Sequence, residues 1–303
     1  MKIEKMERNM QIESAPDGFI VRIGGKIFTQ FISRHSLPKP IFYPVCTPSG
    51  ISITRNVPEV DGGDPVADHP HHRGLWCGHG SVNGCDFWEE YRPDHGIIRT
   101  ESVSYSIDNT MGHISLATQW EDAGGVKILR ENREISVFGV ADANIMDINL
   151  TLSPVASAVS FGDTKEGGLV AVRLAPLMIA EKTGRIFNAD GMDYSAKTSG
   201  PETTWGKRSR WCAYCGQPVE GRSASVVIIH RPGGFRFPTW WHVRAYGLFT
   251  ANPFGASFFE SHTTPPPCGD YTLHAGESLY SSYRVIVADG ILTPARIAEL
   301  EKN

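Results

Sequence analysis

The chain has 303 residues, a formal net charge of −4 and 41% hydrophobic residues, which is enough apolar material for a sizeable core. Its basic residues are scattered, which argues against a nucleic-acid partner, and no run approaches the roughly 20 apolar residues of a membrane-spanning helix. Residues 1–18 carry charges throughout, so we expect no secretory signal, no membrane partner and a cytoplasmic protein.

Short alternating segments dominate the chain and predict β-strands. Residues 18–31 predict a hairpin that turns at Gly24 and Gly25. Further strands are expected, in chain order, over residues 97–107, 114–120, 126–137, 145–152, 169–174, 225–230, 246–249, 256–259 and 279–287. Residues 38–80 are rich in Pro and Gly and predict a long functional loop that is nearly free of strands. Thr293 and Pro294 predict the start of a C-terminal helix.

These elements predict an all-β fold. No strand–helix–strand alternation appears, which argues against Rossmann and TIM-barrel architectures. We therefore expect a large antiparallel β-sandwich in one domain, residues 1–303, with few short helices and one at the C-terminus. Exposed edge strands would allow a homodimer, although nothing else in the sequence points to one.

The six cysteines are expected to be free. They lie at positions 46, 77, 85, 212, 215 and 268, and a chain without a secretory signal favours buried thiols over disulfides. Cys212 and Cys215 have the spacing of a zinc knuckle, but Cys77 and Cys85 are too widely spaced to supply the partner pair.

The first candidate site is the histidine-rich segment 69–79. Imidazoles titrate near neutral pH and bind metals, and the interleaved Gly and Pro exclude a regular helix. In an extended segment His71 and His72 would point to opposite faces, so both enter one pocket only if the loop bends near Pro70 and Gly74. The alternative is that single histidines cap loop carbonyls or stack on tryptophans.

The second candidate site is the glycine-bracketed segment 162–168. It carries Asp163, Lys165 and Glu166 directly before an apolar strand. Glycines allow the backbone to approach a ligand closely, which favours a binding turn. A charged surface turn is the alternative.

The third candidate site lies on a strand near residue 242. Alternation would place Trp240, His242, Arg244 and Tyr246 on one side, with Asn252 shortly after. A flat apolar ring, an imidazole, a guanidinium and a phenol form a suitable lining for a polyhydroxylated ligand. The alternative is a partly buried sheet face that closes the core.

At these segments the chain resembles the family that carries the PmoA-like ("methane oxygenase") label. The matching segments are residues 43–50, 69–80, 83–88, 162–168, 241–248 and 252–255, in the expected order. The label does not describe a function for this chain, because a particulate methane monooxygenase subunit is an integral membrane protein. The resemblance implies a galactose-mutarotase-like supersandwich and a setting in sugar catabolism.

Mutarotase-like enzymes pair a histidine acid with a carboxylate base across a concave sheet. No mutarotase motif is present here, so we assign roles by chemistry alone. We expect a carbohydrate-active enzyme, an epimerase, lyase or hydrolase acting on a sugar or keto-sugar, that requires no cofactor. Glu166 is the candidate base, and the candidate acids are His71, His72 and His242. The candidate substrate-binding residues are Arg73, Trp76, His79, Asp86, Lys165, Trp240, Arg244, Tyr246 and Asn252.

Two alternatives stay open. In the first, the chain is a metal-dependent enzyme, in which His69, His71, His72 and His79 bind a divalent metal that activates water, with Asp86 or Glu166 adding an oxygen ligand. In the second, it is a non-catalytic sugar-binding module, for which the same aromatic and polar face would suffice.

Overall fold

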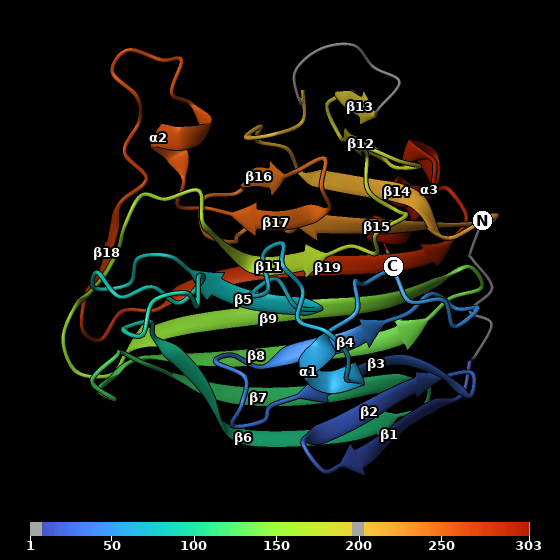
Figure 1. Ribbon diagram of the computed structural model, residues 1–303, viewed down its shortest axis with the longest axis horizontal. Helices are drawn as coiled ribbons and strands as arrows, with labels where there is room; N and C mark the ends of the chain where they lie inside the picture. The colour runs from blue at the N-terminus through green and yellow to red at the C-terminus, as the bar shows by residue number, and fades with distance from the viewer. Residues whose placement is uncertain (1–7, 196–202, 303) are drawn as a thin grey trace.

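Two large antiparallel sheets dominate the computed structural model, which describes residues 8–195 and 203–302. Figure 1 looks onto the eight-stranded sheet, whose strands cross in front of the long strands of the other sheet. In spatial order the eight strands are β1 (Met10–Ala15), β2 (Gly18–Ile23), β3 (Lys26–Ile32), β4 (Ile41–Val45), β5 (Leu75–His79), β11 (Gly167–Arg173), β17 (Leu248–Asn252) and β16 (Trp240–Val243).

The second sheet has nine strands. In spatial order they are β13 (Asp193–Ser195), β12 (Arg185–Asn188), β14 (Trp211–Val219), β15 (Arg222–His230), β19 (Leu279–Asp289), β9 (Ala143–Pro154), β8 (Lys127–Gly139), β7 (Met111–Glu121) and β6 (Ile97–Asp108). A separate pair joins β10 (Val159–Phe161) to β18 (Tyr271–Leu273). The helices are α1 (Pro58–Asp61), α2 (Ala256–Phe259) and α3 (Pro294–Lys302).

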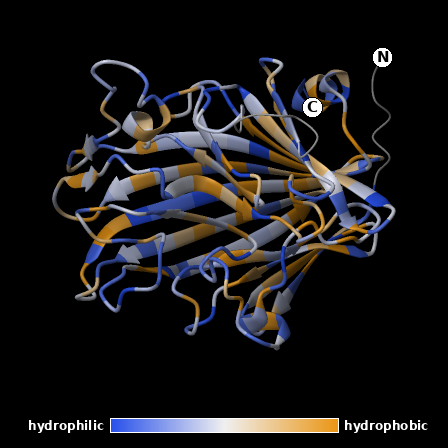
Figure 2. Cartoon of the chain, turned by 45° about the horizontal axis from the view of Figure 1, so that its top comes forward, coloured by the Kyte–Doolittle hydropathy of each residue, from blue (hydrophilic) through white to orange (hydrophobic). Residues whose placement is uncertain are grey.

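The main core lies between the two large sheets. Phe19, Phe31 and Phe42 reach it from the eight-stranded sheet, and Trp120 and Tyr283 reach it from the other. Hydrophobic and hydrophilic residues alternate along many of the long strands (Figure 2), because successive side chains point to opposite faces. The predicted all-β class and the large antiparallel sandwich are confirmed.

The outer face of the eight-stranded sheet carries a second cluster of buried side chains. On β5, Leu75 and Cys77 point into the main core, whereas Trp76 points outward and packs with Trp88 and Tyr43. The segments between β4 and β5 and between β5 and β6, which include α1, cover this face (Figure 1). Side chains of the candidate site therefore meet on the side of the sheet that faces away from the main core.

The C-terminal helix was predicted correctly. Helix α3 begins at Pro294, and the Thr293 hydroxyl accepts a hydrogen bond from the Arg296 backbone N–H at 3.2 Å. Ile297 and Leu300 are buried against the outer face of the nine-stranded sheet. The helix therefore covers the sandwich on the side opposite the candidate site.

Most predicted strands are confirmed, beginning with the hairpin at 18–31. Its turn is formed by Gly24 and Gly25, whose φ angles of 62° and 77° lie in the left-handed region that favours glycine. The prediction that residues 38–80 are nearly strand-free is wrong in part, because this stretch contains β4 and β5. Both strands are covered on both faces, so their short apolar runs show no alternation.

The strand predicted over 256–259 is wrong. These residues form helix α2, and the Asp163 carboxylate accepts the backbone N–H of Ser257 at 3.1 Å in its first turn. This contact joins residues 94 positions apart, so local propensity could not indicate it. The strand expected at 246–249 begins instead at Leu248, because Gly247 N–H closes a turn on the Arg244 carbonyl.

The cysteines are free, as predicted, but the expected burial is wrong for Cys85, which is half-buried, and for Cys268, which is exposed. Cys212 and Cys215 lie on the same strand, but the first points into the main core and the second toward α3. An odd spacing on a strand turns two side chains to opposite faces, so this pair cannot share a metal ion. Within the described ranges, none of the helices is long and apolar enough to cross a membrane.

Candidate functional site

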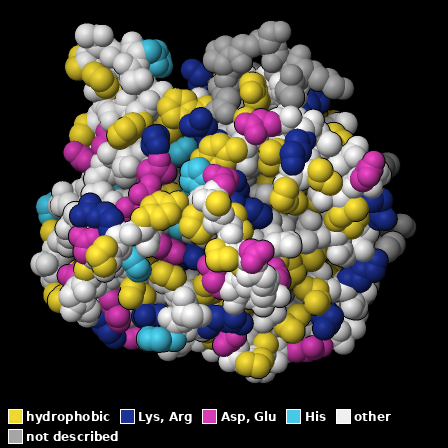
Figure 3. All heavy atoms as spheres, viewed as in Figure 1, with side chains coloured by type: hydrophobic (Ala, Val, Ile, Leu, Met, Phe, Trp, Pro, Cys, Tyr) yellow, Lys and Arg dark blue, Asp and Glu magenta, His cyan; other side chains and the backbone are white. Residues whose placement is uncertain are grey.

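Titratable side chains gather on the outer face of the eight-stranded sheet. Figure 3 shows histidine, acidic and basic groups next to one another on this face, in the region where Figure 1 places β5, β11 and β17. They come from the histidine loop at 68–73, the turn at 164–167 and the β16–β17 hairpin. These are the three segments singled out in the sequence.

A column of nearly parallel rings forms the centre of this site. His69 stacks on Tyr246, with ring centroids 5.1 Å apart, and on His72, at 4.8 Å. His72 in turn stacks on Trp76 of β5 at 5.3 Å. His71 meets His72 edge-on, at 4.2 Å. The loop therefore bends so that His71 and His72 meet, which is the condition for both to enter one pocket.

Arg55 holds the bend of the histidine loop. Its guanidinium donates to the carbonyls of Asp68 and His69 at 2.7 Å each, and to that of His72 at 3.0 Å. The bend includes His69 at a φ of 46°, which side chains other than glycine adopt rarely. It ends at Gly74, where a Cβ would lie 2.4 Å from the Phe42 carbonyl oxygen.

Arg173, at the end of β11, connects the loop to the sheet. It forms a close ion pair with the Asp68 carboxylate and donates to His72 Nδ1 at 3.3 Å. Because Nδ1 accepts this hydrogen bond, the neutral His72 ring carries its proton on Nε2. Asp68 also pairs closely with His69 Nδ1. The arginine and the loop acid therefore fix the orientation of two imidazoles.

A buried ion network lies beneath the loop. Arg73 donates to Glu59 at 2.7 Å and to Glu90 at 2.6 Å, and Glu90 accepts from Lys39 at 2.6 Å. The charge of Arg73 is therefore used within the protein, which gives this residue a structural role where a substrate contact was predicted.

His242 of β16 is fixed against the acidic turn. Its Nδ1 donates to the Lys165 carbonyl at 2.6 Å, which leaves the lone pair on Nε2. Asn252 supports the same turn, because its amide donates to the carbonyls of Thr164 and Lys165 at 3.0 Å each. Asn252 is fully buried, so it acts as a positioning residue for the turn.

The Glu166 carboxylate is accessible and close to other charges. Its side chain is 27% exposed and pairs closely with Lys165. Burial raises the pKa of Glu89, and the neighbouring carboxylates of Asp86 and Glu166 raise it further. The pKa of Asp86 is also raised, by burial and by Glu166. The backbone N–H groups of Trp88 and Glu89, which donate hydrogen bonds to the Asp86 carboxylate, act in the opposite direction. These carboxylates therefore form one electrostatically coupled group.

Burial keeps three imidazoles of the site neutral. It lowers the pKa of His71 to about 3, and that of His72 well below its usual value. It lowers the pKa of His242 to about 4, even though the Glu166 carboxylate and the hydrogen bond to Lys165 act in the opposite direction. These rings are therefore uncharged at neutral pH, with a proton on only one of the two ring nitrogens.

Several ring nitrogens of this site lack a hydrogen-bond partner within the part of the chain that the structure describes. They are His71 Nδ1, His72 Nε2, Trp76 Nε1, Trp88 Nε1, Trp205 Nε1 and His242 Nε2, and all are buried. Unsatisfied buried polar atoms are uncommon in native structures, and each calls for an explanation such as a catalytic role or a bound group. Their convergence on one face supports a ligand site there.

One predicted site residue lies elsewhere. His79 points into the main core, where it packs on Phe161 and Phe254, and its Nε2 donates to the Gly162 carbonyl at 2.9 Å. His79 is two positions after Cys77 on β5, and side chains at this spacing point to the same face. Both side chains therefore point into the main core, and not toward the predicted site. Trp240 lies on the same side of β16 as His242, as predicted, and is buried beside α2, where its indole N–H donates to Glu260 at 2.7 Å.

The four loop histidines do not form one ligand set, because His79 lies on the other face of the sheet. Across residues 8–195 and 203–302, no three His, Cys, Asp or Glu side chains are grouped so as to hold a metal ion. The predicted set of His69, His71, His72 and His79 is therefore not assembled.

Asp68 and Arg173 are site residues to which the sequence alone led us to assign no role. Arg173 had a recognisable signal, since it is a charge at the end of the apolar strand β11, two positions after the outward-facing Ala171 and therefore on the same face. Asp68 directly precedes the histidines, which is the position from which a carboxylate reaches the next imidazole. Arg55 gave no comparable signal.

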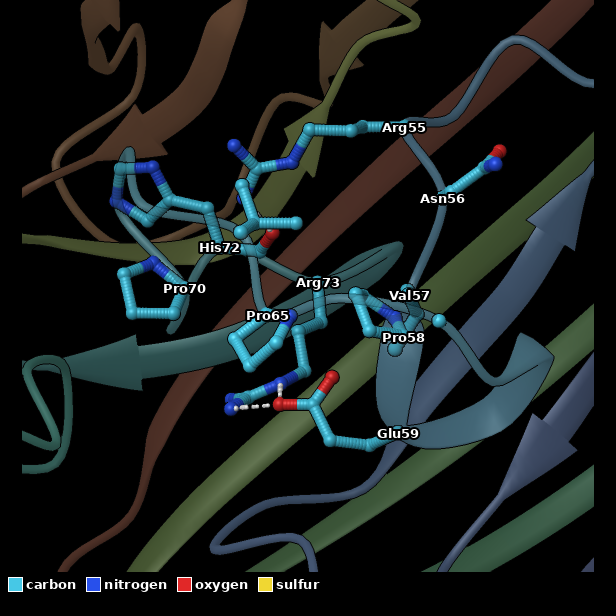
Figure 4. Close-up of a pocket in the computed structure, with 11 residues that line it drawn as sticks. Arg55, Asn56, Val57, Pro58, Glu59, Pro65, Pro70, His72 and Arg73 are labelled. Carbon is cyan, nitrogen blue, oxygen red and sulfur yellow. Dashed lines mark hydrogen bonds and ion pairs between the residues drawn. The ribbon is translucent and has the colours of Figure 1, made fainter.

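Two cavities flank the histidine loop. One, of about 260 Å³, is lined by prolines and by the Arg73–Glu59 pair, and Figure 4 shows the His72 imidazole on the side away from that pair. The other, of about 240 Å³, is lined by Asp68, Arg173 and Tyr246, among others. The second cavity thus opens beside the ring column.

A family model matches residues 19–302 of the chain. The chain belongs to this family of unknown function, DUF6807. The match covers all three site segments of this DUF6807 member. None of the matches described here bears the PmoA-like label, so that label stays a prediction. No curated protein matches the chain in sequence.

The DUF6807 chain is similar in fold to several solved structures. A GH36 α-galactosidase from Geobacillus stearothermophilus matches at 11% identity and a TM-score of 0.48, over 93% of this chain and 41% of that one. The galactose 1-epimerase of Lactobacillus acidophilus matches at 9% identity and 0.38, over 94% and 99%. A galactose mutarotase-like protein from Lactobacillus casei matches at 6% and 0.39, over 92% and 100%. The chain spans about two fifths of the length of the galactosidase, and these likenesses concern the fold alone.

Proposed function

We propose that this protein is a carbohydrate-active enzyme that transfers protons to and from a sugar or keto-sugar, as an epimerase, a lyase or a hydrolase. His242 is the proposed proton-transfer group, and Glu166, which the sequence suggested as the base, is the carboxylate that stabilises its charged form. The observation that carries the proposal is the 2.6 Å hydrogen bond from His242 to the Lys165 carbonyl, which holds an imidazole beside the next residue's carboxylate.

The tautomer of His242 determines its first step. Its Nδ1 proton is engaged by the turn, and burial lowers its pKa to about 4, so the neutral ring presents a lone pair on Nε2. In the proposed reaction this lone pair takes a proton from the ligand, and the Glu166 carboxylate stabilises the imidazolium that forms. His242 thus begins as a base, in contrast to the acid role that the sequence suggested, and becomes an acid only afterwards.

The surroundings of this pair fit a polyhydroxylated ligand. The Arg244 guanidinium lies 5.6 Å from the Tyr246 ring centroid and 5.9 Å from that of Trp205. Aromatic faces cover the apolar side of a sugar ring, and phenol and indole groups bond its hydroxyls. The partly exposed Lys165 and Glu166 offer a donor and an acceptor at the same place.

The test is turnover of a panel of monosaccharides and 3-keto-sugars, followed by NMR in D₂O so that epimerisation, elimination and carbon–hydrogen exchange are all detected. Glu166→Gln should abolish turnover and leave sugar binding within about tenfold, or about 1.4 kcal/mol. Glu220→Gln makes the same change on the exposed turn between β14 and β15, and is the matched control.

Two results would count against this proposal. Turnover retained in Glu166→Gln would remove Glu166 from its role. Calorimetric binding of a sugar by the wild-type protein with no product after long incubation would favour a non-catalytic sugar-binding module.

A further inference from the structure

His69 differs from the other imidazoles of the site in its accessibility. Its side chain is 39% exposed, whereas His71, His72 and His242 are each 1–2% exposed as residues. A proton exchanged with a ligand must pass through a nitrogen that the ligand can reach. Solvent and a ligand reach the His69 ring in the structure as it stands, whereas they reach His242 Nε2 only when the side chains that cover it move.

The neighbouring carboxylate fixes the tautomer of His69. An Asp68 oxygen accepts a hydrogen bond from His69 Nδ1, and the other oxygen of Asp68 is paired with Arg173. The Nδ1 proton is therefore engaged, and the lone pair of the neutral ring lies on Nε2. An imidazole oriented by a carboxylate at Nδ1 is a recurrent arrangement for general acid–base catalysis.

The ring of His69 is also fixed in position. Its plane lies within 9° of the Tyr246 ring and within 10° of the His72 ring, and it stacks on both. The backbone at His69 is held by Arg55, which donates hydrogen bonds to the backbone carbonyls of Asp68 and His69. A group that is held in this way loses little entropy when it meets a ligand.

A cavity lies beside the side chains that hold this ring. The cavity of about 240 Å³ is lined by Asp68, Arg173 and Tyr246, each of which contacts His69 or its partner carboxylate. The His69 imidazole is also close enough to Glu89 to affect its pKa, and Glu89 is coupled in the same way to Glu166. His69 does not itself line this cavity, but it stacks on Tyr246, which does, and it is within electrostatic reach of Glu89.

We propose that Asp68 and His69 form an acid–base dyad, in which His69 Nε2 exchanges a proton with a hydroxyl group of the bound sugar. This inference rests on the proposed function and adds a catalytic residue to it. The Nε2 lone pair takes the hydroxyl proton, the O–H electron pair stays on the sugar oxygen, and the Asp68 carboxylate stabilises the imidazolium. The proton returns to the ligand when the step reverses or when a second oxygen presents itself. Arg173 is a positioning residue that holds Asp68.

The dyad is tested first without a substrate. In ¹⁵N-histidine-labelled protein, long-range ¹H–¹⁵N spectra should show His69 protonated at Nδ1 and unprotonated at Nε2. The variant Asp68→Asn should lose this tautomer preference, and His69→Gln assigns the signal by its disappearance. A His69 ring protonated at Nε2 in the wild-type protein would overturn the dyad.

The second arm uses the sugar panel described above. His69→Gln should lower turnover about 10²–10⁴-fold and leave binding within about tenfold, and Asp68→Asn should also lower turnover. His274→Gln, which changes an exposed histidine after β18, is the matched control. Turnover in His69→Gln equal to that of His274→Gln would refute the catalytic role. If the wild-type protein converts no sugar, the proposed function fails, and the NMR result alone then decides the dyad.

Discussion

His242 and Lys165 are joined by a hydrogen bond of 2.6 Å from an imidazole Nδ1 to a backbone carbonyl, across 77 positions of sequence. This contact ties strand β16 to the turn that precedes β11. It fixes which nitrogen of His242 carries the proton, and it places the ring beside Glu166. The chemistry that we propose for the site depends on this relationship.

One substitution distinguishes the role of the His242 Nδ1 hydrogen bond from that of the His242 Nε2 lone pair. His242→Asn places an amide N–H where Nδ1 stood, so it preserves the contact with the Lys165 carbonyl and removes Nε2. We expect turnover to fall about 10²–10⁴-fold while the free energy of unfolding changes little. Rates on the sugar panel and urea unfolding measure the two effects. Wild-type turnover in this variant would show that His242 serves only to hold the turn.

Arg55 should contribute strongly to stability. Arg55→Lys keeps the charge but cannot reach all three loop carbonyls with one ammonium group. We expect the free energy of unfolding to fall by about 1–3 kcal/mol, the cost of leaving a buried acceptor unpaired. Arg222→Lys, at an exposed position on β15, is the control for urea unfolding. An Arg55→Lys protein as stable as this control would mean that the loop holds its bend without the guanidinium.

The buried histidines predict acid sensitivity. Burial lowers the pKa of His79 to about 4 from an ordinary value of 6.5, so the unfolded chain binds a proton between these values and the folded chain does not. The free energy of unfolding therefore keeps its full value above pH 6.5. It falls as the pH decreases toward 4, by about 1.4 kcal/mol per pH unit for each such histidine. His230 and His242 act in the same direction.

A substitution at His79 measures this contribution. His79→Gln keeps a donor for the Gly162 carbonyl and removes the titrating ring. We expect the dependence of unfolding free energy on pH to become shallower by about 1.4 kcal/mol per unit across that window, as followed by urea unfolding at several pH values. His274→Gln, which alters an exposed ring, should leave the slope unchanged. An unchanged slope in His79→Gln would show that folding does not lower the pKa of His79.

The sequence by itself determined the elements whose signals are local. The hairpin at 18–31 follows from alternation around Gly24 and Gly25, and helix α3 follows from Thr293 and Pro294. Alternation along β5 also predicts that His79 points into the core together with Cys77. These features depend on a few neighbouring residues, so the chain alone encodes them.

Only the tertiary structure decided how the site is assembled. Asp68 meets Arg173 across 105 positions, and helix α2 exists where Asp163 reaches Ser257 across 94. The bend that brings His71 and His72 together needs His69 in a left-handed conformation, which Arg55 holds from outside the loop. Such contacts depend on which strands become neighbours in the sheet, and local propensity carries no information about that pairing.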